Sequence, residues 1–243
     1  MMRPMRDEFK YVVSHEVRES ILERWRRHLR RDPHTNEDAV TPILSQYYDS
    51  PNLLFYEEKM DGVGSLRSKV RLRTYGTEFR SGQATFLEIK QRLWDRVRKV
   101  RQRVNEFALA DLNPERWRFD SREDESAFRV LQLRYRLRPS AQVWYLREAY
   151  ECTVESDVRV TFDSCLTSLF PGERLTRNHL SDPSRRCMRD DQFIFEVKAT
   201  NGVPPWVVEG VKLGEMRQVP VPKYVMAVER LQLHKTTPSG VYL

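Results

Sequence analysis

The sequence lacks a run of about 18 apolar residues, the length that a membrane-spanning helix needs, so we expect no membrane span. Its opening, Met1 to Lys10, is charged and has no apolar signal core, which argues against a secreted protein. The cysteines Cys152, Cys165 and Cys187 are scattered and have no CxxC spacing. They therefore predict neither a zinc site nor a disulfide framework, and are typical of a reduced, cytoplasmic protein.

The chain does contain enough apolar material for a sizeable core, since 40% of its 243 residues are hydrophobic. No segment repeats at a fixed period and no linker stands out, so we expect a single domain over residues 1–243. The formal net charge is +7. A basic excess predicts a polyanionic partner, such as nucleic acid, an acidic membrane or a phosphorylated small molecule. Charge alone does not choose among these.

Alternating and helical patterns give a coarse order of elements. Strands are expected at residues 9–13, 43–48, 68–75, 84–92, 97–103, 141–152, 158–163 and 193–199. Helices are expected at residues 16–31, 53–59, 105–112, 123–137, 205–212 and 223–232, with loops at 32–42 and 172–191. Because strands and helices do not alternate regularly, we expect an α+β fold built on an antiparallel sheet or barrel of about eight strands with packed helices.

The expected strands carry charges on alternate positions. In Lys69-Val70-Arg71-Leu72-Arg73 the cations share one face and the aliphatic residues share the other. The same alternation occurs around Glu8 and Lys10, Glu88 and Lys90, Lys99 to Arg103, Arg159 to Asp163, and Glu196 and Lys198. One solvated sheet face is the plain interpretation. Its recurrence in six strands, together with apolar stripes on the helices that need a surface to cover, favours charges that point into a barrel.

A barrel interior rich in cations is costly to desolvate and repels itself unless anions are present. A water-filled tunnel that admits a chain of phosphates removes both problems. Arginine offers planar forks to phosphate oxygens, and lysine offers compact point charges. The few carboxylates on the same faces could hold a divalent metal that neutralises the phosphates.

Several short motifs occur in an order that resembles a known family. They are "RDEFKYVV" at the start, "SQYYDSPNLLFYEEK", "KVRLRTYG", "FLEIKQR", "RKVRQRV", "YLREAYE", "VRVTFD", "FEVKATNGVPPWV" and, near the end, "VPKYVMAVERL". Together they resemble the VTC domain, the polyphosphate polymerase domain of vacuolar transporter chaperone proteins. That family belongs to the triphosphate tunnel metalloenzymes, which include CYTH-type proteins. Arg6 stands where the CYTH signature has its first glutamate, which favours the VTC branch.

The resemblance implies an eight-stranded antiparallel tunnel barrel with surrounding helices, in which the γ-phosphate of ATP is transferred to a growing inorganic polyphosphate chain. It assigns a catalytic role to Arg71, Arg73, Lys90, Lys99 and Lys223. It assigns substrate binding to Lys10, Arg101, Arg147, Arg159 and Lys198. It makes Glu196 the expected ligand of Mn²⁺ or Mg²⁺, assisted by Glu88 or Asp163, and places Glu8 elsewhere in the tunnel.

Other functions stay open at this point. The same fold could hydrolyse inorganic or nucleoside triphosphates, or bind polyphosphate without turnover. A basic barrel that binds nucleic acid would need exposed aromatic residues on an outer groove, and we expect no nucleic-acid partner. Individual residues also have structural alternatives, since Glu8 and Glu88 could simply pair with Lys10 and Lys90.

Overall fold

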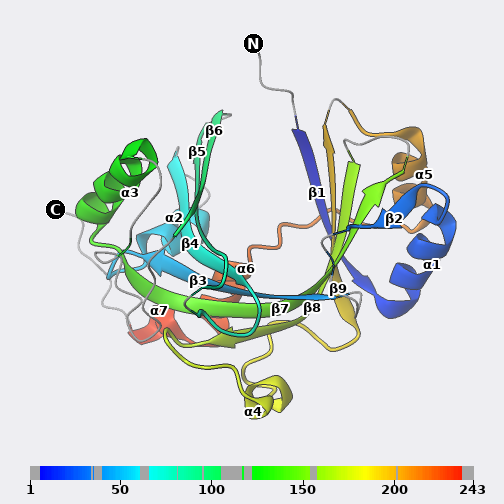
Figure 1. Ribbon diagram of the computed structural model, residues 1–243. Helices are drawn as coiled ribbons and strands as arrows, with labels where there is room; N and C mark the ends of the chain where they lie inside the picture. Colours follow the sequence, from blue (N-terminus) through cyan, green and yellow to red (C-terminus); the bar gives the residue numbers. More distant parts are fainter. Residues whose placement is uncertain are drawn as a thin grey trace. The chain divides into compact units, whose positions relative to one another are not determined.

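The computed structural model describes residues 6–33, 35, 40–60, 66–80, 82–94, 96–104, 117, 122–153, 158–200 and 202–236, and Figure 1 labels its elements. The strands are β1 (Arg6–Ser14), β2 (Leu29–Arg31), β3 (Thr41–Asp49), β4 (Leu66–Tyr75), β5 (Thr85–Leu93), β6 (Arg96–Arg103), β7 (Arg138–Cys152), β8 (Val158–Leu169) and β9 (Gln192–Thr200). The helices are α1 (His15–Trp25), α2 (Leu54–Met60), α3 (Arg122–Tyr135), α4 (Arg177–Ser181), α5 (Pro205–Leu213), α6 (Lys223–Arg230) and α7 (Leu233–Thr236).

The strands form an antiparallel, mostly-sheet α+β fold, as the sequence predicts. Their hydrogen-bonded order is β1-β9-β8-β7-β3-β4-β5-β6, and the short β2 also pairs with β7. Within the described residues this order is open, with β1 at one end and β6 at the other. The nine-stranded sheet therefore confirms the antiparallel class, and it does not confirm closure into an eight-stranded barrel.

The chain divides into two compact units. Unit 1 is Met1–Thr41, Tyr145–Leu166 and Met188–Pro222, and unit 2 is Pro42–Trp144, Thr167–Cys187 and Lys223–Leu243. The division falls within β7 and β8 and after the first residue of β3, so each of these strands contributes residues to both units. That the whole chain forms one domain stays a prediction.

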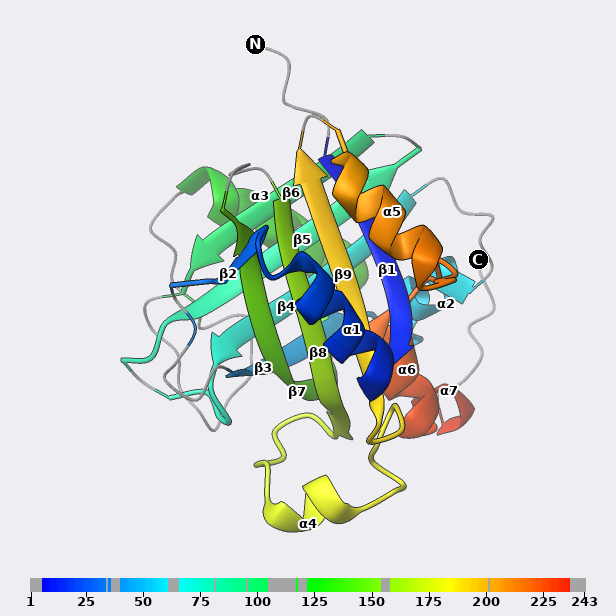
Figure 2. The same cartoon turned by 90° about the vertical axis from the view of Figure 1, so that its right-hand side faces the viewer.

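Unit 1 buries the apolar faces of its strands under α1 and α5, which lie on the same side of β1 and β9 (Figure 2). Ser14 begins α1 as its N-cap, because its hydroxyl accepts a hydrogen bond from the backbone N–H of Val17. Trp25 of α1 and the strand residues Phe162 and Phe195 are almost fully buried in the core between these helices and the strands, and each contributes about 1.5–3 kcal/mol through burial. The opposite faces of the same strands therefore remain for the charged residues.

Gly210 sets how closely α5 approaches α1. A Cβ atom at this position would lie 2.5 Å from Nε1 of Trp25, a distance that real Cβ contacts essentially never reach. Glycine is therefore required here by packing, although it lowers the helix propensity of α5.

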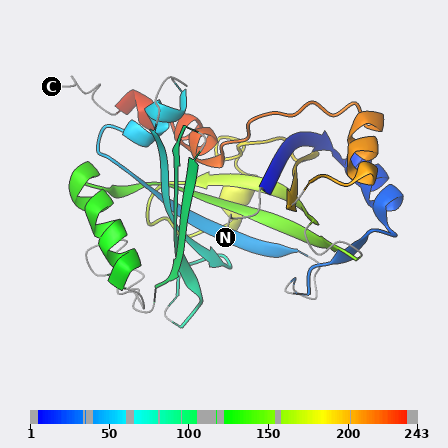
Figure 3. The same ribbon diagram turned by 90° about the horizontal axis from the view of Figure 1, so that it is seen from above.

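Unit 2 likewise buries the aliphatic residues of its strands, since Val70, Leu72, Leu87 and Ile89 are at most 3% exposed. Its helices α2 and α6 lie side by side, with α7 next to α6 (Figure 3). This alternation of buried aliphatic and charged positions is the pattern that the sequence predicts for these strands.

Several predicted boundaries are wrong. The helix expected over residues 16–31 ends at Trp25, because Leu29–Arg31 leave it to pair with β7, Leu29 opposite Cys152. The helix expected over 123–137 ends at Tyr135, where Arg136 takes a φ of 50°. The helix expected over 223–232 ends at Arg230, and Gln232, with a φ of 56°, precedes α7.

Other predictions differ less or fall outside what is described. The strand expected over 158–163 continues to Leu169, and the expected loop 172–191 contains the short helix α4. The helix expected over 105–112 lies outside the described residues. Among the helices that are described, each is too short or too polar to cross a membrane.

Candidate functional site

A cluster of arginines in unit 2 surrounds the carboxylate of Glu88. The register of β4, β5 and β6 places Arg71, Glu88 and Arg101 directly opposite one another in one row. Arg71 donates through Nε at 2.8 Å and lies 2.7 Å away through Nη2, both to Oε2 of Glu88. Arg73 Nη1 and Arg101 Nε lie 3.7 Å and 3.6 Å from the same carboxylate. Three guanidinium groups therefore share one negative charge.

The three arginines of this cluster favour the ionised form of the carboxylate that they surround. Burial alone would raise the pKa of Glu88, but the positive charges of Arg71, Arg73 and Arg101 lower it to about 2. The cluster thus keeps a net charge of +2 at neutral pH, a value that favours binding of an anion.

Tyr47 on β3 belongs to the same cluster, although it was not predicted from the sequence. Its hydroxyl accepts a hydrogen bond from Nη1 of Arg71 at 3.1 Å. Burial would raise the pKa of this phenol, but Arg71, Arg73 and Lys223 outweigh burial and lower it. The start of α6 adjoins the cluster, because Tyr224, which follows Lys223, stacks its ring on Tyr47.

A second row of cations lies two residues along the strands. Lys69, Lys90 and Lys99 are directly opposite one another on β4, β5 and β6. Side chains two residues apart share a face of the sheet, so this row continues the face that carries Arg71 and Arg101. Lys99 is exposed to solvent, whereas Lys69 is partly buried. The row holds no carboxylate and extends the positive surface of unit 2.

Unit 1 carries a cluster of different composition on β1 and β9. Lys10 lies opposite Glu196, and Glu8 lies opposite Lys198. Nζ of Lys10 is 2.8 Å from Oε1 of Glu8 and 4.0 Å from Oε1 of Glu196, whose carboxylate also lies 2.5 Å from Nζ of Lys198. Burial lowers the pKa of Lys198 to about 8, and Arg147 adds to this, while Glu196 opposes it. Cations and carboxylates alternate here.

The remaining predicted residues of unit 1 form arginine–aspartate pairs. Arg147 on β7 donates two hydrogen bonds to the fully buried Asp163 on β8, Nε to Oδ1 at 2.6 Å and Nη2 to Oδ2 at 2.7 Å. Burial would lower the pKa of Arg147, but Asp163 more than offsets it and raises that pKa well above its ordinary value. Arg159 donates to Asp32 at 2.7 Å and is half exposed. Asp32 was not predicted from the sequence, because its partner Arg159 lies 127 residues further along the chain.

The carboxylates differ in their fitness for a metal. In the part of the chain that the structure describes, no three His, Cys, Asp or Glu residues cluster as a ready-made metal site. Glu88 and Asp163 are bound by guanidinium groups. Glu8 and Glu196 instead face ammonium groups, since both approach Lys10 and Glu196 also contacts Lys198. Mg²⁺ and similar ions are commonly held by one or two carboxylates together with substrate phosphates, and this pair fits that pattern.

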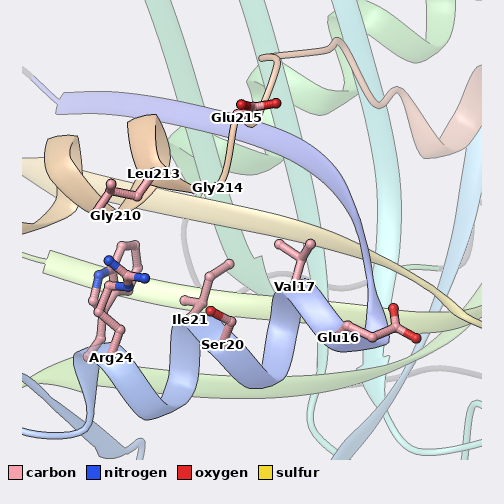
Figure 4. Close-up of a pocket in the computed structure, with 10 residues that line it drawn as sticks. Glu16, Val17, Ser20, Ile21, Arg24, Gly210, Leu213, Gly214 and Glu215 are labelled. Atoms are coloured by element: carbon pink, nitrogen blue, oxygen red, sulfur yellow. The ribbon is translucent and has the colours of Figure 1, made fainter.

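A separate hollow of about 350 Å³ lies between α1 and α5 of unit 1 (Figure 4). Its lining mixes the apolar Val17, Ile21 and Leu213 with the charged Glu16 and Arg24, and Glu215 lies at its edge. None of the predicted site residues lines it. With two carboxylates and one guanidinium, it does not suit a phosphate chain.

The fold and the charged faces define a class of protein: an antiparallel α+β protein whose strands present arginine, lysine and glutamate. The family model of the VTC domain matches residues 5–232, and the chain belongs to the VTC domain family. A search of curated proteins finds no match.

One solved structure shows the same fold, and two others align less well. A candidate adenylate cyclase from Bacillus halodurans aligns with a TM-score of 0.51 at 15% identity, covering 91% of this chain and 96% of that one. A protein from Pyrococcus horikoshii (12% identity, 93% and 99% coverage) and a conserved hypothetical protein from Pyrococcus furiosus (12% identity, 92% and 99% coverage) both align with a TM-score of 0.46. At 15% identity, the likeness to the Bacillus halodurans protein shows the fold alone.

Proposed function

We propose that the chain is a metal-dependent polyphosphate polymerase, which transfers the γ-phosphoryl group of ATP to the end of an inorganic polyphosphate chain. The observation that carries this proposal is the group of three arginines around the single carboxylate of Glu88. Membership of the VTC domain family supports it as well. The closed eight-stranded tunnel expected from the sequence is part of this proposal.

In unit 2 the proposed role of the cations is to bind the phosphates that react. The contacts of Nε and Nη2 of Arg71 with Oε2 of Glu88 fix its guanidinium, so that it is oriented before the substrate arrives. Arg73, Lys90, Lys99 and Lys223 add positive charge around the transferred group. Phosphoryl transfer needs little covalent chemistry from the protein, so positioning and charge stabilisation supply most of the catalysis.

In unit 1 we assign the metal to Glu196 with Glu8, because both already approach the ammonium of Lys10. A bound Mn²⁺ or Mg²⁺ would neutralise phosphate charge there. The proposed contacts to other phosphates in unit 1 are Lys10, Lys198, Arg147 and Arg159. In unit 2 this role is assigned to Arg101. The arginine contacts of Glu88 and Asp163 favour Glu8 over these two as the partner of Glu196.

The acceptor distinguishes the polymerase from a triphosphatase of the same fold. A terminal phosphate is ionised at neutral pH and needs no strong base, whereas a hydrolase must orient a water molecule. Glu88 and Asp163 are held by arginines, and Glu196 is held by lysines, so these carboxylates are poorly placed to act as bases. This supports phosphate as the acceptor.

The test is incubation with ATP and Mn²⁺ or Mg²⁺, followed by ³¹P NMR. A growing signal from internal phosphates is expected. Release of orthophosphate alone would identify a triphosphatase instead. Binding of tripolyphosphate without any turnover would identify a binding module, and either result would overturn the polymerase.

A further inference from the structure

A buried carboxylate at the end of β3 connects two helices of unit 2. Asp49 is 0% exposed. Its Oδ1 accepts hydrogen bonds from the backbone N–H groups of Ser50 and Phe55 at 2.7 and 2.9 Å, and its Oδ2 accepts one from Tyr56 at 3.0 Å. Oγ of Ser50 adds a longer hydrogen bond to Oδ1 at 3.5 Å, and the hydroxyl of Tyr224 on α6 donates to Oδ2 at 2.6 Å. Asp49 therefore fixes the beginning of α2 and the beginning of α6 to one point.

Capping of α2 does not by itself explain this arrangement. The hydroxyl of Ser50 already accepts the backbone N–H of Leu54 at 2.9 Å, and a serine cap costs no buried charge. Burial of a carboxylate is expensive, and here it raises the pKa of Asp49 to about 6. The additional feature of Asp49 is its hydrogen bond to Tyr224, which reaches 175 residues along the chain.

Tyr224 continues the connection toward the arginine cluster. Its ring stacks on Tyr47 with 5.1 Å between ring centroids and an interplanar angle of 26°. Its hydroxyl also accepts a hydrogen bond from Oγ of Ser140 at 3.0 Å. Tyr47 in turn accepts a hydrogen bond from Arg71. Because Tyr224 directly follows Lys223, whatever fixes Tyr224 also fixes the backbone that carries the Lys223 ammonium.

We propose that Asp49 and Tyr224 are positioning residues, which hold the first turn of α6 so that Lys223 serves the phosphate cluster of Arg71 and Arg73. Neither residue is expected to touch the substrate. This inference rests on the proposed function, in which Lys223 binds phosphate. If Tyr224 is a positioning residue, loss of its hydroxyl should weaken phosphate binding only while Lys223 is present. A general contribution to stability would not depend on Lys223.

The test is a double-mutant cycle on tripolyphosphate affinity, measured by titration calorimetry. Tyr224→Phe keeps the stacked ring and removes the hydrogen bond to Asp49, and we expect it to weaken binding about tenfold, since small misplacements of a binding group are costly. Lys223→Met should weaken binding at least as much. In the double variant, Tyr224→Phe should add nothing further. An equal factor in both backgrounds would overturn the inference, because the hydroxyl would then act independently of Lys223.

A matched control exists in unit 1, where the hydroxyl of Tyr150 donates to Oε2 of Glu148 at 3.0 Å. Tyr150→Phe also removes a hydrogen bond from a tyrosine to a carboxylate, and wild-type affinity is expected. If Tyr224→Phe does not fold, Asp49→Asn replaces it in the cycle, since it removes the charged acceptor and keeps a polar group of the same size. Wild-type protein that fails to bind tripolyphosphate would overturn the proposed function itself. Wild-type protein that binds, with a variant that loses nothing, would overturn only the positioning role.

Discussion

The charged faces of the two units use different means to present positive charge. In unit 2 the groups are Arg71, Arg73 and Arg101 around Glu88, with a net charge of +2. In unit 1 they are Lys10, Lys198 and Arg147 set against Glu8, Glu196 and Asp163, with a net charge of zero. The first set suits an anion directly. The second becomes attractive to phosphates when a divalent cation joins it, so the difference suggests a division between phosphate binding and metal binding.

The two units also differ in how they hold a fully buried aspartate. Asp163 in unit 1 and Asp49 in unit 2 are both 0% exposed. Asp163 is paired with the guanidinium of Arg147, whereas the hydrogen bonds of Asp49 come from backbone N–H groups and from the hydroxyls of Ser50 and Tyr224. A charged partner offsets the cost of burial far better than neutral donors do. The two sites should therefore respond oppositely to removal of charge.

The largest expected effect is the loss of the charged partner in unit 1. Arg147→Met leaves Asp163 buried without its counter-charge, and the free energy of unfolding should fall by about 3–5 kcal/mol. Urea unfolding measures this. Arg101→Met is the comparison in unit 2, because Arg101 is half exposed and Glu88 keeps Arg71, so it should cost less than about 1 kcal/mol. Similar losses in both variants would remove the distinction between the two units.

The buried aspartate of unit 2 should make stability depend on pH. The pKa of Asp49 is about 6 in the folded protein and 3.8 in the unfolded chain, so the folded state binds the proton more tightly. Its contribution to stability is therefore full below pH 3.8 and is lost as pH rises toward 6, by about 3 kcal/mol for a difference of about two pKa units.

Asp49→Asn removes this titration. As pH rises from 4 to 7, the free energy of unfolding of this variant should therefore increase relative to that of the wild type. Urea unfolding at a series of pH values checks this. Asp191→Asn is the control, since Asp191 is exposed and has a lowered pKa from its contact with Arg189. It should keep the wild-type dependence over that range. An Asp49→Asn variant that follows the wild type at every pH would contradict the raised pKa.

Much of this comparison could be predicted from strand periodicity. Alternation with period 2 places Arg71, Arg73 and Glu88 on faces opposite the aliphatic residues, and the structure confirms that the aliphatic residues are buried. The pattern does not reveal which cation approaches which carboxylate. That depends on register, and register is set by turns and by pairing across the sheet.

Other features depend on contacts that no local pattern contains. The strand Leu29–Arg31 follows a helical sequence and exists because β7 offers it backbone partners. The roles of Asp49 and Tyr224 emerge only when residues far apart in the chain meet. The paired aromatic and acidic residues in "YYDS", and the "KY" that begins α6, were the available signals. They indicated a family motif, and they did not indicate that the two segments contact each other.

Two glutamate variants test whether unit 1 binds the metal and unit 2 binds phosphate. Glu196→Gln should lower metal-dependent turnover about 100-fold and raise the Mn²⁺ concentration needed for half-maximal activity, because one carboxylate ligand is lost. Glu88→Gln should leave that Mn²⁺ concentration unchanged, since Glu88 is surrounded by guanidinium groups. Metal titrations of the initial rate measure both. If Glu88→Gln shifts the metal dependence and Glu196→Gln does not, the assignment of metal to unit 1 is wrong.

The smallest expected effects grade the cations within unit 2. Arg71→Met should weaken tripolyphosphate binding about tenfold, because it removes a fixed guanidinium and its charged hydrogen bonds to phosphate. Lys99→Met should weaken it about threefold or less, because the exposed ammonium of Lys99 is screened by solvent. Arg80→Met, at an arginine whose side chain is 65% exposed and which pairs with Glu78, should keep the wild-type affinity. If Lys99 proves to matter more than Arg71, phosphate binding in unit 2 is centred on the lysine row and not on the arginines around Glu88.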